Sequence, residues 1–124
     1  MSSQIRALTR KTNRGGEKVD VAVYTLDRLR GLEQLYRRGF HSAVIDRTVD
    51  KLLAAEIEQA KTEQRDLEIR LSAYEEQYNM PSEEFYRRFR SGELGDEMDF
   101  VEWSVFYEMY QALLERLRLL GATA

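Results

Sequence analysis

The side chains that could support catalysis or bind a metal are few in this chain, and they are not grouped. His41 is the only histidine among the 124 residues, and there is no cysteine. Without a second histidine or a thiolate, a zinc site would need carboxylates alone, whereas zinc is usually held by nitrogen and sulfur ligands. His41 directly precedes a helix-start signal at Ser42, so we interpret it as a turn residue. We predict no catalytic residue, no metal site and no cofactor.

The densest group of carboxylates lies between residues 93 and 102, and it does not match a calcium loop. An EF-hand places oxygen ligands at alternate positions around a central glycine and ends on a glutamate. Here Gly95 comes before most of the acids and the spacing differs. Acidic side chains at a helix start also stabilise the helix dipole without an ion. We interpret Asp99 and Glu102 as a capping box that begins the last helix. The acidic residues of this group are Glu93, Asp96, Glu97, Asp99 and Glu102.

Charge divides the chain into a basic front and an acidic back. Residues 1–51 hold 11 Lys and Arg and 6 Asp and Glu, whereas residues 52–124 hold 8 and 16. The basic part could attract phosphates and the acidic part could bind a different partner. The alternative is a chance asymmetry in a helical protein. No apolar run approaches the ~20 residues that span a bilayer, and no signal peptide is evident. We therefore expect a cytoplasmic protein with no membrane contact.

The first part of the chain predicts an arm followed by one short strand. Residues 1–18 are polar, basic and interrupted by two glycines, which is typical of a flexible arm. The segment VDVAVY, from Val19 to Tyr24, alternates and is rich in β-branched residues, as short strands are. A lone strand leaves its backbone groups unpaired, and no second strand is evident. We therefore expect this strand to pair with its copy in another chain.

The rest of the chain predicts helices. Thr25 would begin one that reaches about Arg38, and Gly39 would end it. Ser42 would begin a long second helix with no stop signal before Asn79. Ile45, Val49, Leu53 and Ile57 fall four apart, as on a helix packed in a core. The next apolar positions alternate three and four apart, which predicts a coiled coil. They are Ile57, Ala60, Gln64, Leu67, Leu71, Tyr74 and Tyr78.

Residues 81–124 predict a helical hairpin with an aromatic stripe. A short helix, SEEFYRRF, would be followed by a last helix that ends at Leu120 before Gly121. The stripe would either pack on the long helix as a private core or form an interface with a partner protein. In the second interpretation Trp103 is the anchor, because buried tryptophans are frequent interface hot spots. The partner-binding residues would be Phe85, Phe89, Trp103, Phe106 and Tyr110.

The order of strand, helix, turn and serine-started helix resembles the ribbon-helix-helix family, to which Arc- and MetJ-type repressors belong. The segment SAVIDRTVDKLL, from Ser42 to Leu53, is similar to the second helix of that family, and the resemblance covers about residues 19–57. It implies a mainly α fold in which one strand from each chain forms a two-stranded ribbon that enters the DNA major groove. It also implies that the start of the second helix, near His41 and Ser42, binds a phosphate.

From the resemblance and the charge division we predict an antitoxin-type transcriptional repressor. Residues 1–18 would be the basic arm, 19–57 the dimerisation and DNA-binding region, 58–80 a coiled-coil extension and 81–124 an acidic region for a protein partner (a toxin). The alternative is a helical scaffold or adaptor that self-associates and does not bind DNA. The predicted dimer contacts are Val19, Val21, Val23, Ile45, Val49 and Leu53. The predicted DNA contacts are Arg6, Arg10, Lys11, Arg14, Lys18, Arg28, His41, Ser42 and Arg47.

Overall fold

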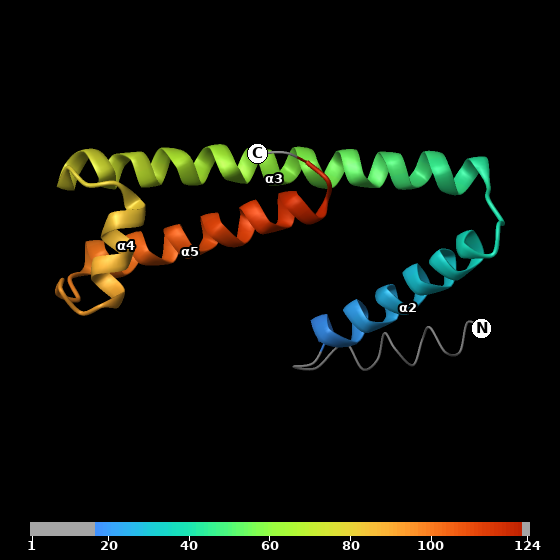
Figure 1. Cartoon of the computed structure of the whole chain (residues 1–124), viewed down its shortest axis with the longest axis horizontal. Coiled ribbons are helices and arrows are strands. Elements are labelled where there is room, and N and C mark those ends of the chain that lie inside the picture. The colour runs from blue at the N-terminus through green and yellow to red at the C-terminus, as the bar shows by residue number, and fades with distance from the viewer. Residues whose placement is uncertain (1–16, 123–124) are drawn as a thin grey trace. The chain divides into compact units, whose positions relative to one another are not determined.

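The regular structure in the described part of the chain is helical. The computed structural model describes residues 17–122, and its helices are α2 (Glu17–Arg37), α3 (Ala43–Tyr78), α4 (Ser82–Arg90) and α5 (Met98–Leu119) (Figure 1). The chain forms two compact units. Unit 1 ends at Arg47 and unit 2 begins at Thr48. Because their relative placement is not fixed, each unit is described by itself.

The predicted strand from Val19 to Tyr24 is wrong. These residues lie inside α2, Thr25 lies in its interior, and no strand occurs within residues 17–122. The physical reason is backbone pairing: a helix satisfies its own N–H and C=O groups within one chain, whereas a single strand cannot. The preference of valine for strands is weak beside this, because it depends mostly on packing against neighbouring strands. The cross-chain ribbon, and with it the ribbon-helix-helix fold, is therefore not formed.

The predicted break between the first two helices is confirmed, and the chain turns there in a defined way. Gly39 has φ of +94°, a conformation that side chains rarely adopt. The Phe40 amide donates to the Leu35 carbonyl and the Gly39 amide donates to the Tyr36 carbonyl, each at 3.1 Å. This is the Schellman arrangement that closes helix ends. Ser42 then precedes α3, and its carbonyl accepts the Asp46 amide at 2.9 Å.

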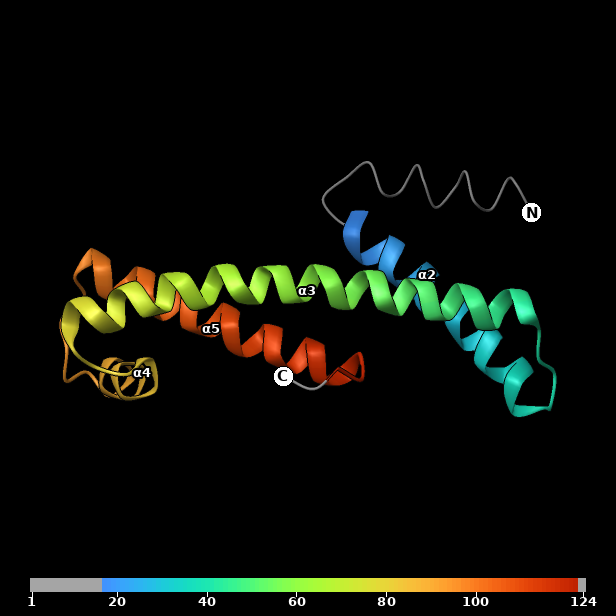
Figure 2. The same cartoon turned by 90° about the horizontal axis from the view of Figure 1, so that it is seen from above.

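Unit 2 is an antiparallel hairpin of α3 and α5 with α4 packed at its closed end (Figures 1 and 2). Contacts run in opposite order along the two helices. Near the closed end Tyr78 donates to Asp99 at 2.6 Å, and at the open end Arg116 donates to Glu63 at 3.0 Å. The seam predicted as a coiled coil is thus buried by α5 of the same chain. The fold is all helical, and this extension does not project as a separate element.

Two groups of side chains form the core of unit 2. One joins α3 and α5 through Ala60, Leu67, Leu113 and Leu117. The other gathers Leu71 with the aromatic residues of α4 and α5. Its largest members, Phe85 and Trp103, have ring centroids 3.8 Å apart and nearly parallel planes. The private-core interpretation of the aromatic stripe is the one that the structure shows.

Candidate interaction surfaces

The predicted DNA contacts are not gathered into one surface in the described part of the chain. Arg28 is exposed on α2, where its guanidinium lies 4.6 Å from the centroid of the Tyr24 ring. His41 and Ser42 occupy the turn before α3, and Arg47 is exposed near the start of that helix. No hydrogen bond or ion pair between described residues links these groups. Four of the predicted contacts fall outside the described residues, and the side chain of a fifth is also not described. They are Arg6, Arg10, Lys11, Arg14 and, for the side chain, Lys18.

The turn between α2 and α3 is held by one tyrosine. The Tyr36 hydroxyl donates to an Asp46 carboxylate oxygen at 2.6 Å and lies 3.2 Å from the Ser42 backbone. The hydrogen bond to Asp46 is the main cause that raises the pKa of Tyr36 above its usual value, because it stabilises the protonated phenol as the donor. The start of α3 is thereby fixed to the end of α2. The described part of unit 1 therefore has a defined corner, although no side chain of residues 20–47 is buried.

Residues 20–59, on α2 and the first part of α3, carry many large apolar side chains that stay exposed in the described part of the chain. No side chain among residues 20–59 is buried, from the middle of α2 to well inside α3. Large hydrophobic side chains are nonetheless frequent there, and their exposures range from 39% to 65%. We call this set the N-terminal apolar surface: Val21, Val23, Leu26, Leu29, Leu35, Phe40, Val44, Val49, Leu52 and Leu53.

Most of the predicted dimer contacts belong to this surface. Val21 and Val23, which were expected on a strand, lie on helix α2. Val21 and Val23 are exposed on α2, while the side chain of Val19 is not described. Within unit 2, Val49 and Leu53 are exposed at 39% and 40%. They precede the point at which α5 begins to cover the seam, where Ile57 packs against the core. Ile45, at the start of α3, is partly buried. The apolar face of α3 therefore continues past the end of its intramolecular cover.

The residues predicted to bind a partner through the aromatic stripe are mostly enclosed. Phe85 and Trp103 are 0% exposed, and the indole N–H donates to the Ser82 hydroxyl oxygen at 2.9 Å. Phe89, Phe106 and Tyr110 pack against the same core group with their rings partly buried. A partner cannot reach the two largest rings in this conformation.

A second apolar stripe lies on the opposite face of α5, and the sequence analysis did not identify it. Met98, Val101, Val105 and Met109 are exposed at 41% to 77%, although α5 also buries an apolar face against α3 and α4. The signal was present in the spacing of three, four and four residues, which places these side chains on one face of a helix. The sequence analysis considered only the aromatic stripe on the other face of this helix as a partner-binding surface. We call this set the outer α5 stripe.

Tyrosines hold the carboxylates that border the outer α5 stripe. On the side facing α3, Tyr74 donates to Glu102. On the side facing α4, Tyr86 donates to Glu108 at 2.7 Å. Burial is the main cause that raises the pKa of Tyr74 to about 12. A phenol that remains protonated supplies a hydrogen bond but no positive charge, so these carboxylates keep their net charge.

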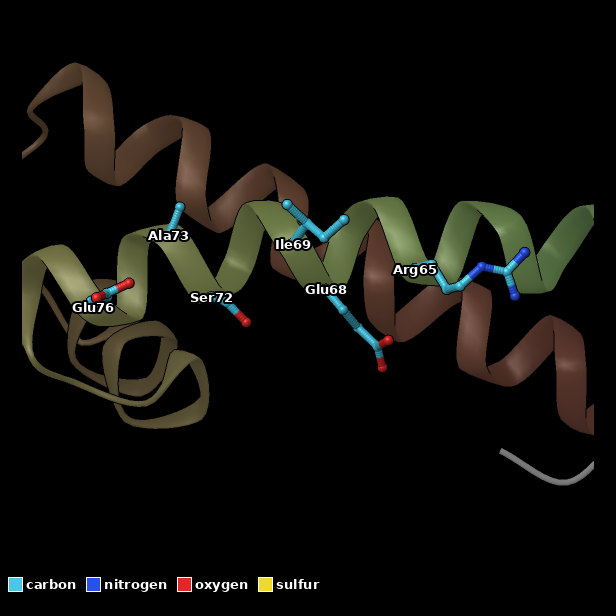
Figure 3. Close-up of a pocket in the computed structure, with 6 residues that line it drawn as sticks. All are labelled: Arg65, Glu68, Ile69, Ser72, Ala73 and Glu76. Atoms are coloured by element: carbon cyan, nitrogen blue, oxygen red, sulfur yellow. The ribbon is translucent and has the colours of Figure 1, made fainter.

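An open hollow along α3 does not have the form of a ligand site. It is lined by residues of α3 alone, and their side chains fan out along the helix without converging (Figure 3). Ile69 at its centre is 70% exposed. Ligand sites are normally concave and combine several elements around a few convergent polar groups. The lining residues are Arg65, Glu68, Ile69, Ser72, Ala73 and Glu76.

Two further findings, on metal ligands and on membrane spans, concern residues 17–122. No group of three or more potential metal-ligating side chains lies together there, and none of the helices is long and apolar enough to cross a membrane. The described part of the chain thus offers two exposed apolar surfaces as candidate interaction sites, beside a small hollow of about 220 Å³ between α3, α4 and α5. Comparisons with protein-family profiles, curated proteins and solved structures found no significant match to the chain.

Proposed function

We propose that this chain is a helical adaptor that self-associates through its N-terminal apolar surface and thereby joins two copies of the folded hairpin in unit 2. The observation that carries the proposal is the absence of any buried side chain among residues 20–59. Short helices gain most of their stability from packing an apolar face. Helix α2, whose described side chains include none that is buried, therefore needs a partner to remain folded.

The size of the apolar surface sets the expected strength of association. Fully burying a large aliphatic side chain contributes roughly 1.5–3 kcal/mol, and these side chains are already about half covered. The set can therefore contribute on the order of 10 kcal/mol before other terms. The loss of translational and rotational freedom opposes association by about 4–15 kcal/mol. Because the two quantities are comparable, we expect an assembly that dissociates on dilution.

The charge of the same segment favours a second copy as the occupant. Residues 17–61 hold eight Lys and Arg and eight Asp and Glu. Two copies of such a segment do not repel one another on approach. Two copies of α2 and of the first part of α3 also supply four helices rich in exposed apolar side chains, which is the composition of a four-helix bundle with twofold symmetry. The proposed assembly is accordingly a dimer built from two corners.

A DNA-binding repressor has less support. The ribbon that would have entered the major groove is a helix, so the resemblance no longer supplies a way to read bases. The basic arm remains in the sequence, with Arg10, Lys11 and Arg14 among its charges, but it lies outside the described residues. Arginine and lysine contacts to phosphates are sequence-independent and weaken steeply with salt. The adaptor account therefore expects no salt-resistant complex with a DNA duplex.

Sedimentation of the full chain over a concentration series tests the proposal. The chain has a mass of 14.6 kDa, and we expect twice that mass at high concentration and the single mass on dilution. Leu53→Glu, which puts a charge on the N-terminal apolar surface, should shift the equilibrium to monomer. Ile69→Glu is the matched control, because it makes the same kind of change on the same helix outside that surface.

Two results would overturn the proposal. One is a monomeric wild-type chain that keeps full helicity at all concentrations, because the apolar surface would then be covered within one chain. The other is a dimer that Leu53→Glu leaves as stable as Ile69→Glu does. Loss of helicity together with loss of the dimer in Leu53→Glu is the expected pattern, since folding of α2 depends on association.

A further inference from the structure

Helix α5 has more apolar surface than the hairpin can bury. Its inner face supplies the buried residues Trp103, Leu113 and Leu117, while Val105 and Met109 on the other side are 47% and 50% exposed. A helix of a soluble domain normally has one apolar face and one polar face, and a helix that is apolar all round is normally enclosed. The outer α5 stripe is therefore an apolar helix face that no other described part of the chain covers.

The charge of α5 along this stripe is mainly negative. Residues 91–115 hold seven Asp and Glu and no Lys or Arg. Two nearby cations are engaged, since Arg70 lies over the Phe106 ring at 5.1 Å and Arg116 pairs with Glu63 at 3.0 Å. The hydrogen bond to Glu108 raises the pKa of Tyr86, and Arg90 of α4 lies close enough to that phenol to offset part of the rise, so the Glu108 border is less negative than the Glu102 border. The bordering carboxylates of Glu102 and Glu108 accept hydrogen bonds only from tyrosines, which leave their charge in place.

We propose that the outer α5 stripe is the docking surface for a basic amphipathic helix of a partner protein. The stripe positions follow one another by three, four and four residues, which is how a helix meets the apolar face of another helix. Lysines and arginines flanking the partner's apolar face would lie against Glu102 on one border and Glu108 on the other. Two methionines in the stripe adapt their shape to different partner side chains.

The mainly negative charge separates this surface from the N-terminal apolar surface. Two outer α5 stripes brought face to face would set like charges against each other, which is unfavourable. A second copy therefore cannot cover this stripe symmetrically, whereas the charge-balanced surface on α2 and α3 permits that pairing. An anionic membrane is disfavoured for the same electrostatic reason. Docking at α5 is independent of self-association, so either proposal can fail without the other.

Calorimetric titration of the full chain with a synthetic helix tests the docking surface. The probe is an amphipathic peptide with leucines on one face and lysines on the other, and its matched control carries glutamates in place of the lysines. We expect the lysine peptide to bind, the glutamate peptide not to bind, and the affinity to fall at least tenfold in high salt because exposed charges are screened.

Variants of the chain locate the binding site. Val105→Glu should weaken binding of the lysine peptide at least tenfold, whereas Ile69→Glu, on α3, should leave it unchanged. Glu102→Gln and Glu108→Gln together should weaken it several-fold while the amide oxygens still accept the tyrosine hydrogen bonds. Leu53→Glu should bind the peptide as the wild type does, because the proposed self-association surface lies elsewhere. Circular dichroism of each variant confirms that unit 2 is folded.

Three outcomes overturn the docking proposal. The first is that the lysine peptide does not bind, which would mean that the stripe is covered within the chain or has no helical partner. The second is equal binding of both peptides, or binding that Val105→Glu leaves intact, since the site would then lie elsewhere. The third is co-sedimentation of the chain with anionic vesicles together with no peptide binding, which would assign the stripe to a lipid surface.

Discussion

Replacing Trp103 with alanine should severely destabilise unit 2. The indole is fully buried and stacks on Phe85 with ring centroids 3.8 Å apart, and its centroid lies 5.5 Å from that of Tyr74 and 5.7 Å from that of Tyr78. Its N–H donates to the buried Ser82 hydroxyl oxygen at 2.9 Å. The substitution removes the largest side chain of the core and opens a cavity among rigid rings that cannot move together to fill it.

The expected loss is a large fraction of the stability that such a unit has. Truncating a buried tryptophan costs about 3–5 kcal/mol, and the hydrogen bond lost at Ser82 adds on the order of 1 kcal/mol. A unit the size of residues 48–124 is stable by about 4–12 kcal/mol at the usual 0.05–0.15 kcal/mol per residue. The melting temperature should fall by at least ~12 °C, at about 4–8 °C per kcal/mol.

Urea unfolding followed by circular dichroism measures this loss. Residues 20–47 of unit 1 bury no side chain, so the transition at higher urea should report unit 2. Val105→Ala is the matched control on the outer face of the same helix, and it should change the free energy of unfolding by no more than ~0.5 kcal/mol. Equal free energies of unfolding for Trp103→Ala and Val105→Ala would refute the assignment of Trp103 to the core. The indole would then be the anchor for a partner protein, as the sequence interpretation had it.

Three further predictions concern a buried hydroxyl, two tyrosines and a turn. Ser82→Ala should cost unit 2 about 1–3 kcal/mol in urea unfolding, because the buried indole N–H loses its acceptor; a change below ~0.5 kcal/mol would contradict that hydrogen bond. Burial raises the pKa of Tyr74 to about 12, and a hydrogen bond to a carboxylate raises that of Tyr78 to about 12. The stability that this gives is complete below pH ~10 and is lost as the pH rises through ~12, so thermal melts should show a fall there that is smaller when both tyrosines are phenylalanine. Gly39→Ala should weaken the dimer by about 1–2 kcal/mol in sedimentation, because φ there is positive, whereas Gly95→Ala should leave it unchanged.

The helical part of the fold was largely predictable. The start of α3 near Ser42, its end near Asn79 and the short α4 follow from caps and breakers in the sequence. These signals act within a few residues, so they are visible without tertiary contacts. The seam from Ile57 to Tyr78 was also recognised, but its partner was not. A spacing of three and four residues shows that a face is apolar, and it does not specify which helix covers that face.

The N-terminal segment was mispredicted because two periodicities overlap in it. The valines from Val19 to Val23 alternate as in a strand, yet Ala22, Leu26 and Leu29 also fall on one helical face. The missing second strand, which we interpreted as pairing between chains, is explained more simply by the absence of any strand in residues 17–122. Continuity with the following helix outweighed the local preference of valine.

At the start of α5, too, tertiary contacts override a local sequence motif. Asp99 and Glu102 have capping-box spacing, but the helix begins at Met98 after Glu97, with no side-chain cap. Both carboxylates are drawn instead to tyrosines of α3, with Asp99 accepting from Tyr78 at 2.6 Å. The local motif was replaced by tertiary hydrogen bonds. The acidic border of the outer α5 stripe could not be found without the fold for this reason.

Hydrogen exchange at several protein concentrations tests the central claim most directly, which is that residues 20–59 fold by associating with a second copy. Amide protection in α2 should rise with protein concentration, while protection in α5 should stay constant because unit 2 has its own core. Leu53→Glu should abolish the rise, and Ile69→Glu should preserve it. Strong α2 protection that is independent of concentration, in a chain that sediments as a monomer, would contradict the account.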